Sequence, residues 1–184
     1  MLTANIELLE HHIVWENPTP TFNSRHAYFP GMAKLPSGDL LAIFPIGQAF
    51  ESADQIIYLS RSKDNGRTWS EAKPVHEDFR PGLGTLKITV LDDGSLIATG
   101  YSHYPDGEHW ISHVTGGCPD GMNLICFSHD DGHTWTLPKE LPHRYPEVLE
   151  ISGPCIQLQN KDLVALGTPI PRYDGSRPTG VKGI

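Results

Sequence analysis

Short apolar runs separated by polar turns recur along the chain. Three segments share one pattern, in which an apolar run and a polar turn are followed by Leu, an aliphatic residue and Ala. They are MAKLPSGDLLAIF (32–44), ITVLDDGSLIATG (88–100) and CIQLQNKDLVALG (155–167). Apolar residues on both sides of PSGD, DDGS and QNKD predict a β-hairpin in each segment. No long stretch has helical periodicity. The pattern therefore predicts an all-β protein.

A second motif follows each of the first two hairpins. Both copies fit S-x-D-x-G-x-T-W, as SKDNGRTW (62–69) and SHDDGHTW (128–135), and their tryptophans are 66 residues apart. Each copy is preceded by an apolar segment, QIIYLSRS (55–62) or NLICFSH (123–129), which we predict to be a strand. Each unit then offers four strands, and four strands repeated at this spacing predict β-propeller blades.

The third unit begins but does not finish within the chain. Leu35 precedes Trp69 by 34 residues and Leu91 precedes Trp135 by 44, so a third turn is expected beyond Ile184. Propellers close with roughly 4 to 8 blades. We therefore expect about half a propeller, or alternatively a dimer of halves that closes a ring. The single partial domain over 1–184 would hold an N-terminal strand at 5–16, blade 1 at about 25–74, blade 2 at about 83–140 and the start of blade 3 at about 150–184.

Turn chemistry explains each shared residue of the repeated motif. The Asp can accept backbone N–H groups across the turn, the Gly supplies a positive φ, the Thr suits the returning strand and the Trp covers the turn. The residues expected in this structural role are Ser62, Asp64, Gly66, Thr68, Trp69, Ser128, Asp130, Gly132, Thr134 and Trp135.

A metal site is the alternative interpretation of HDDGH, where His129 and His133 are four residues apart. This spacing puts two histidines on one face only in a helix, whereas strands flank this turn. The first copy of the motif carries Lys63 and Arg67 at these positions, and cations are not metal ligands. A calcium loop of EF-hand type needs more oxygen ligands than the motif provides. No metal or other cofactor is predicted.

Charge and composition exclude several classes of protein. The formal net charge is −8, from 14 basic and 22 acidic residues, which disfavours binding to nucleic acid or to an anionic membrane. Three cysteines without a CxxC pair do not indicate a disulfide framework. The N-terminus has no basic, apolar signal sequence, so the chain as given is expected to be cytoplasmic, or secreted if an upstream signal is missing. The sequence does not indicate an oligomeric state.

The repeated motif is similar to the Asp-box, or BNR repeat, of the sialidase (neuraminidase) superfamily of β-propellers. The resemblance covers about residues 25–184. It implies four-stranded antiparallel blades, six in the complete protein, and an exo-glycosidase that hydrolyses a terminal sialic acid or a related sugar from glycans. Asp-boxes also occur in sortilin-type receptors and photosystem-assembly propellers, so a non-catalytic carbohydrate-binding or structural propeller is the alternative. Because the family's nucleophile belongs to a later blade, we expect this chain alone to be inactive.

The resemblance also implies where the site lies. In sialidases the acid/base Asp sits in the loop between the first hairpin and the first Asp-box strand. This loop contains Glu51 and Asp54 and resembles the G-x-x-E-x-x-D pattern of sialidase-like bacterial proteins. The resemblance implies Asp54 as the acid/base and Glu51 as a substrate contact; a solvated pair of loop carboxylates is the alternative. Tyr28 occupies the position of the first arginine that grips the sialic acid carboxylate, so Arg25 either replaces that arginine or is an ordinary surface residue.

The long loop of the second unit is a second candidate site. YSHYPDGEHWISHVTGGCPDG (101–121) is about ten residues longer than its counterpart in the first unit. Aromatic and polar side chains together suit sugar recognition, so we predict that His103 and Tyr104 contact a glycan. A metal site built from the loop's histidines, or a plain surface loop, are the alternatives.

Overall fold

The computed structural model describes residues 7–19, 21, 23–50, 52–80, 82–104, 111–145 and 147–176. These residues form strands, turns and loops. No helix long and apolar enough to cross a membrane is found among them. The strands are β1 (His26–Ala27), β2 (Gly31–Lys34), β3 (Leu40–Gly47), β4 (Ile56–Ser62), β5 (Lys73–Pro74), β6 (Leu83–Val90), β7 (Leu96–His103), β8 (Gly121–Ser128), β9 (Lys139–Glu140), β10 (Leu149–Glu150), β11 (Ile156–Gln157), β12 (Leu163–Val164) and β13 (Thr168–Pro169).

The strands form antiparallel sheets that follow the two sequence units. The first sheet has the order β2-β3-β4-β5, and β1 also pairs with β3. The second has the order β6-β7-β8-β9. The third unit contributes two short pairs, β10 with β13 and β11 with β12. The predicted hairpins and the all-β propeller architecture are therefore confirmed, with two complete sheets and the beginning of a third.

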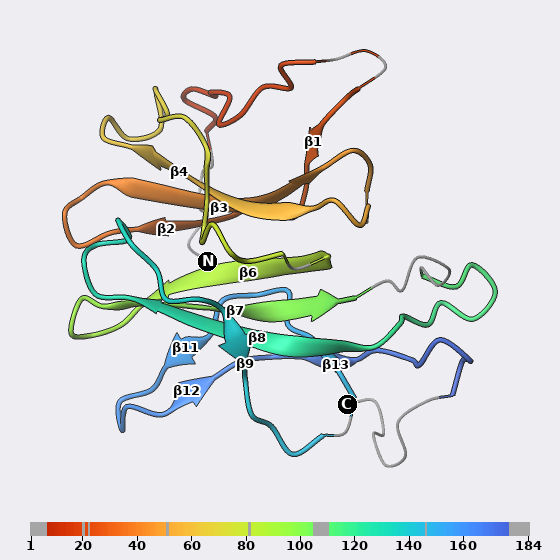
Figure 1. Cartoon of the computed structure of the whole chain (residues 1–184). Coiled ribbons are helices and arrows are strands. Elements are labelled where there is room, and N and C mark those ends of the chain that lie inside the picture. Colours follow the sequence, from red (N-terminus) through yellow and green to blue (C-terminus); the bar gives the residue numbers. More distant parts are fainter. Residues whose placement is uncertain are drawn as a thin grey trace.

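The sheets are stacked face to face as layers, and the chain passes from one layer to the next in sequence order (Figure 1). Leu86 and Ile88 of β6 lie in one buried cluster with Leu41 and Ile43 of β3. This cluster is the core between the first two sheets, and β2 of the first sheet is a neighbour of β6 of the second. Its other buried members are Leu35, Ile57, Leu59, Val75, Phe79, Leu96, Ala98, Leu124, Cys126 and Trp135.

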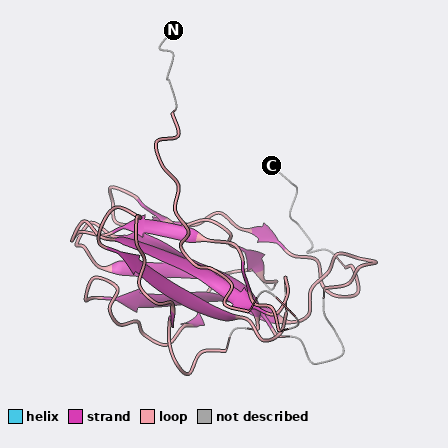
Figure 2. Cartoon of the chain, turned by 90° about the horizontal axis from the view of Figure 1, so that it is seen from above, coloured by secondary structure: helices cyan, strands magenta, loops and turns pink. Residues whose placement is uncertain are grey.

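The prediction of an N-terminal strand over residues 5–16 is wrong for the part that the structure describes, since residues 7–16 form no strand. The chain here runs away from the sheets (Figure 2), and Leu8 and Leu9 are 80% and 84% exposed. Val14 and Trp15 pack against a small cluster around Phe44, and Glu10 pairs with Arg67 at 3.1 Å. Apolar residues alone do not make a strand, because a strand also needs a neighbour for its backbone hydrogen bonds.

Each copy of the S-x-D-x-G-x-T-W motif forms a turn held by its own side chains. Asp64 accepts hydrogen bonds from the backbone N–H of Thr68 at 2.9 Å and from its hydroxyl at 2.6 Å. The Ser62 hydroxyl donates to Asp64 at 2.8 Å and accepts from the Gly66 N–H at 2.7 Å. The second turn repeats this pattern: Asp130 accepts from the N–H and hydroxyl of Thr134 and from the Ser128 hydroxyl, and that hydroxyl accepts from the Gly132 N–H.

The two tryptophans differ in their surroundings. Trp69 is half-buried, and its indole N–H donates to the Gly66 carbonyl at 2.9 Å, so it covers its own turn. Trp135 is 7% exposed and belongs to the core between the first two sheets. The second turn thus also docks on the first sheet, where Arg61 of β4 forms an ion pair with Asp131 at 3.2 Å.

Acid is expected to weaken both turns. Hydrogen bonds from the Thr68 hydroxyl and N–H and from Ser62 lower the pKa of Asp64 to about 2, and the equivalent bonds lower that of Asp130 to about 2. Because both pKa values lie below the unfolded-state value of 3.8, the stabilisation is complete above 3.8 and is lost as the pH falls from there to about 2.

Urea unfolding followed by tryptophan fluorescence between pH 5 and 2 measures this loss. The double variant Asp64→Asn/Asp130→Asn should be less stable at neutral pH and should lose much of the acid dependence. A control at the exposed Glu71, Glu71→Gln, should keep the wild-type dependence. Identical pH profiles for the double variant and the wild type would show that the turns do not carry this linkage.

Candidate functional site

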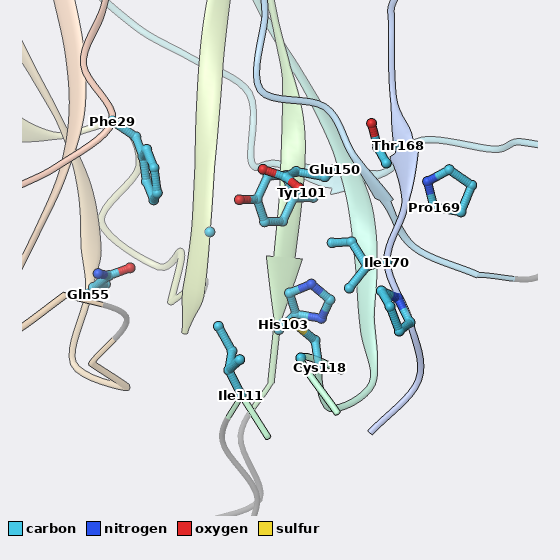
Figure 3. Close-up of a pocket in the computed structure, with 13 residues that line it drawn as sticks. Phe29, Gln55, Tyr101, His103, Ile111, Cys118, Glu150, Thr168, Pro169 and Ile170 are labelled. Atoms are coloured by element: carbon cyan, nitrogen blue, oxygen red, sulfur yellow. The ribbon is translucent and has the colours of Figure 1, made fainter. Parts of the chain in front are cut away.

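A cavity of about 360 Å³ lies where the ends of strands from all three sheets meet (Figure 3). Phe29 and Gln55 come from the first sheet, Tyr101 and His103 from the end of β7, and Glu150 from β10. Glycines at Gly84 and Gly116 and the segment Thr168–Pro171 complete much of the wall. Its size and its mixed aromatic and polar wall are typical of a small-molecule site.

Asp54 is not among the residues that line this cavity, but it directly precedes one of them, Gln55. The β3–β4 loop folds back so that Asp54 accepts a hydrogen bond from the Gln48 N–H at 3.0 Å. The Arg25 guanidinium donates to the other carboxylate oxygen at 2.9 Å. Gly47 permits this fold, since a Cβ there would lie 2.7 Å from Gln55 Cγ. Asp54 is therefore a fixed carboxylate, and Arg25 is not an isolated surface arginine.

The surroundings of Asp54 favour its ionised form. Burial raises the pKa of the carboxyl, but hydrogen bonds from the Ser52 hydroxyl and the Gln48 N–H, together with the charge of Arg25, outweigh burial and lower the pKa overall. At neutral pH Asp54 is thus a carboxylate that can accept a proton or a hydrogen bond. The contacts with Ser52, Gln48 and Arg25 all disfavour the protonated form from which a proton could be donated.

Tyr28 has an aromatic environment. Its ring meets that of Phe50 edge-on at a centroid distance of 5.4 Å, and Phe50 also lies 5.4 Å from Phe29. Burial raises the pKa of the Tyr28 hydroxyl. Tyr28 therefore supplies no cation to this region, and Arg25 is the arginine that reaches Asp54.

The two residues predicted in the second-unit loop differ in position. His103 is 3% exposed and lies in the cavity wall, where its Nδ1 is 2.8 Å from the Pro119 carbonyl oxygen. Tyr104 is 39% exposed and is not part of that wall. Glu51, and residues 105–110 of the same loop, lie outside the described residues.

Sequence reasoning missed Gln55, Tyr101 and Glu150 in the cavity wall. The sequence feature that these three residues share is a position at or near the end of a strand in a repeated unit. Gln55 immediately precedes β4, Tyr101 lies near the end of β7, and Glu150 ends β10 before the third hairpin. Antiparallel hairpins stacked in register bring these strand ends to one side of the molecule. In the part of the chain that the structure describes, no group of three or more His, Cys, Asp or Glu has an arrangement that could hold a metal ion.

Comparisons with known proteins find likeness in structure but not in sequence. No family model and no curated protein matches the chain. Among solved structures, the NanB sialidase from Streptococcus pneumoniae superposes with a TM-score of 0.57 at 12% identity over 89% of this chain. The Hadza microbial sialidase Hz136 gives 0.58 at 18% identity over 76% of this chain. The chain has a sialidase-like β-propeller fold.

A third similar structure is that of an enzyme named for a different sugar. The α-L-arabinanase from Penicillium chrysogenum, solved in complex with arabinobiose, matches with a TM-score of 0.53 at 23% identity over 81% of this chain. This chain spans 44%, 31% and 42% of the NanB, Hz136 and arabinanase chains. At these identities the likeness shows a glycoside-hydrolase-like propeller fold that covers less than half of each neighbour.

Proposed function

We propose that this chain forms the first blades of a sialidase-like exo-glycosidase that hydrolyses a terminal sialic acid or a related sugar from glycans. The observation that carries the proposal is the position of Asp54, which is fixed on the β3–β4 loop directly before Gln55, a residue that lines the cavity at the strand ends. The sialidase and arabinanase neighbours of the fold support it. Glu51, three residues earlier in the same loop, stays a predicted substrate contact.

Asp54 acts as the acid/base in this proposal. Substrate draws Arg25 away from the carboxylate, which removes the cation that favours the ionised form and raises the pKa of Asp54. The protonated carboxyl then donates its proton to the glycosidic oxygen as the bond to the leaving group breaks. Arg25, once released, offers its guanidinium to the bound sugar. Other blades must supply the nucleophile, so the chain alone binds a glycan without hydrolysing it.

A non-catalytic carbohydrate-binding propeller is the second candidate. Two observations favour it: Tyr28 stands where the resemblance expects an arginine, and hydrogen bonds from Ser52 and Gln48, with the charge of Arg25, keep the pKa of Asp54 low in the free protein. In that case the ion pair between Arg25 and Asp54 is a permanent structural link, and the cavity binds a sugar that leaves unchanged.

Substitution of Asp54 tests the proposal in a polypeptide that carries this chain together with further blades. Asp54→Asn is expected to lower kcat/KM about 10²- to 10⁴-fold on glycosides with poor leaving groups, because these need a proton on the departing oxygen. The loss should be much smaller on aryl glycosides with acidic phenols, which leave without protonation. Initial rates on a matched series of sialosides and neutral glycosides measure both effects.

Asp78→Asn, which alters an exposed carboxylate on a different loop, is the matched control and should keep wild-type rates. Full turnover by Asp54→Asn would contradict the acid/base role. Glycan binding without turnover by the wild type would favour the non-catalytic propeller.

A further inference from the structure

Two buried nitrogen atoms in the cavity wall have no hydrogen-bond partner among the described residues. They are Nε2 of His103 and Nε2 of Gln55, whose side chains are 3% and 4% exposed. The residues lie on different sheets and both line the cavity (Figure 3). A buried polar atom without a partner is destabilising, so two of them around one cavity point to a ligand that pairs with them.

The hydrogen-bonding role of His103 is determined by its other nitrogen. Nδ1 lies 2.8 Å from the Pro119 carbonyl oxygen, and a carbonyl only accepts, so Nδ1 carries the hydrogen. Burial lowers the pKa of His103, despite the Pro119 contact and the nearby Glu150 and Asp120, so the ring is neutral at pH 7. Nε2 is then a bare acceptor that requires an N–H or O–H donor from a ligand.

Gln55 has the opposite requirement, because Nε2 of its amide is a donor. A ligand that satisfies both residues must donate to His103 and accept from Gln55. Sugar hydroxyls do both, and neighbouring hydroxyls on one ring can serve two walls of a cavity. Tyr101, whose ring centroid lies 5.8 Å from that of His103, adds an aromatic face of the kind on which sugar rings stack.

The charges around the cavity disfavour an anionic ligand. No Lys or Arg is among the described residues that line it, whereas Glu150 is. Arg172, whose neighbour Pro171 lines the cavity, pairs with Glu147 at 3.5 Å. Lys87 donates to the carbonyls of Phe29 and Pro30. Among the described residues that line the cavity, a carboxylate ligand would meet the Glu150 carboxylate and no cation.

We infer that this cavity is a subsite for an uncharged sugar, whose hydroxyl groups donate to Nε2 of His103 and accept from Nε2 of Gln55. The inference rests on the proposed function in taking the ligand to be a glycan, and it narrows that ligand to a neutral ring. The cavity accepts a hexose or pentose and rejects the equivalent uronic acid.

NMR titration of the 184-residue chain tests the inference with matched sugar pairs. The probes are methyl glycosides of glucose and galactose, their uronic acids, and N-acetylneuraminic acid, followed through the Gln55 side-chain amide and the Gly84 and Gly116 backbone amides. At least one neutral glycoside should bind about tenfold or more tightly than its uronic acid.

Variants of the two residues make the test specific. His103→Phe removes the acceptor and should weaken neutral-sugar binding about tenfold or more. His103→Gln, which keeps an acceptor oxygen, should retain more affinity than His103→Phe. Gln55→Glu replaces the donor by an acceptor and should weaken binding without a change in side-chain volume. His143→Phe, at an exposed histidine, is the control, and an unchanged unfolding midpoint identifies variants that fold.

Equal or tighter binding of the acidic sugars would overturn the inference and leave the proposed function intact, since that function is judged by Asp54-dependent turnover. Wild-type affinity in folded His103→Phe and Gln55→Glu would overturn it as well. Binding of none of the probes would also count against the subsite.

Discussion

Asn123→Ala is expected to lower the free energy of unfolding by about 3–5 kcal/mol. Asn123 lies on β8 with 0% exposure. Its amide nitrogen donates to the Gly100 carbonyl at 3.1 Å and to the Leu149 carbonyl at 2.6 Å, while its oxygen accepts from the Leu149 N–H at 2.9 Å. One side chain thus joins the second sheet to β10 of the third. Alanine would leave these backbone groups unpaired in a buried interface.

Urea unfolding and hydrogen exchange measure this effect. The Leu149 amide should lose its protection from exchange in Asn123→Ala before the amides of β7 do. Asn160→Ala is a matched control, because Asn160 is exposed and bonds only to nearby Asp162, and it should change stability by less than about 0.5 kcal/mol. Wild-type stability of Asn123→Ala would mean that water or a shifted backbone replaces the amide.

Gly100→Ala is expected to abolish cooperative folding of the second sheet. Gly100 lies in the middle of β7, paired with Leu86 of β6. A Cβ at this position would overlap the Thr85 carbonyl oxygen and lie 2.8 Å from the Thr85 carbonyl carbon and 3.0 Å from Leu86 Cα. All three are backbone atoms of β6, so relief requires separation of the two strands. We expect a loss of several kcal/mol or more, because a central ladder must open.

Thermal unfolding and the yield of soluble protein test this prediction. Gly153→Ala is the matched control, since a Cβ there meets no atom within 4 Å, and it should fold like the wild type. Since Tyr101 and His103 lie on the same strand, Gly100→Ala should also abolish sugar binding at the cavity. A soluble Gly100→Ala protein with a wild-type melting temperature would show that the β6–β7 pair shifts at little cost.

The candidate site was only partly predictable from the sequence. The resemblance to sialidases pointed to the β3–β4 loop, and the structure shows that Gln55, the residue after Asp54 in that loop, lines the cavity. The ion pair between Arg25 and Asp54 joins residues 29 apart through the fold, and no local pattern announces it. The same holds for Gln55 and His103, which lie in different units. The absence of a strand at residues 7–16 has a related cause, because strand formation depends on an edge that accepts the segment.

The sequence by itself determined the hairpins, the turns and the repeat, and so the all-β propeller architecture. These features depend on residues within a few positions of one another, through alternation, turn-forming glycines and the Asp side chains that bond to their own loops. Only the tertiary structure decided which side chains share the cavity. Stacked sheets bring Gln55, His103 and Glu150 together, and burial turns His103 into a neutral acceptor. The physical reason is that the hydrogen-bonding role and the charge of a side chain depend on neighbours that are distant in sequence and on its exclusion from water.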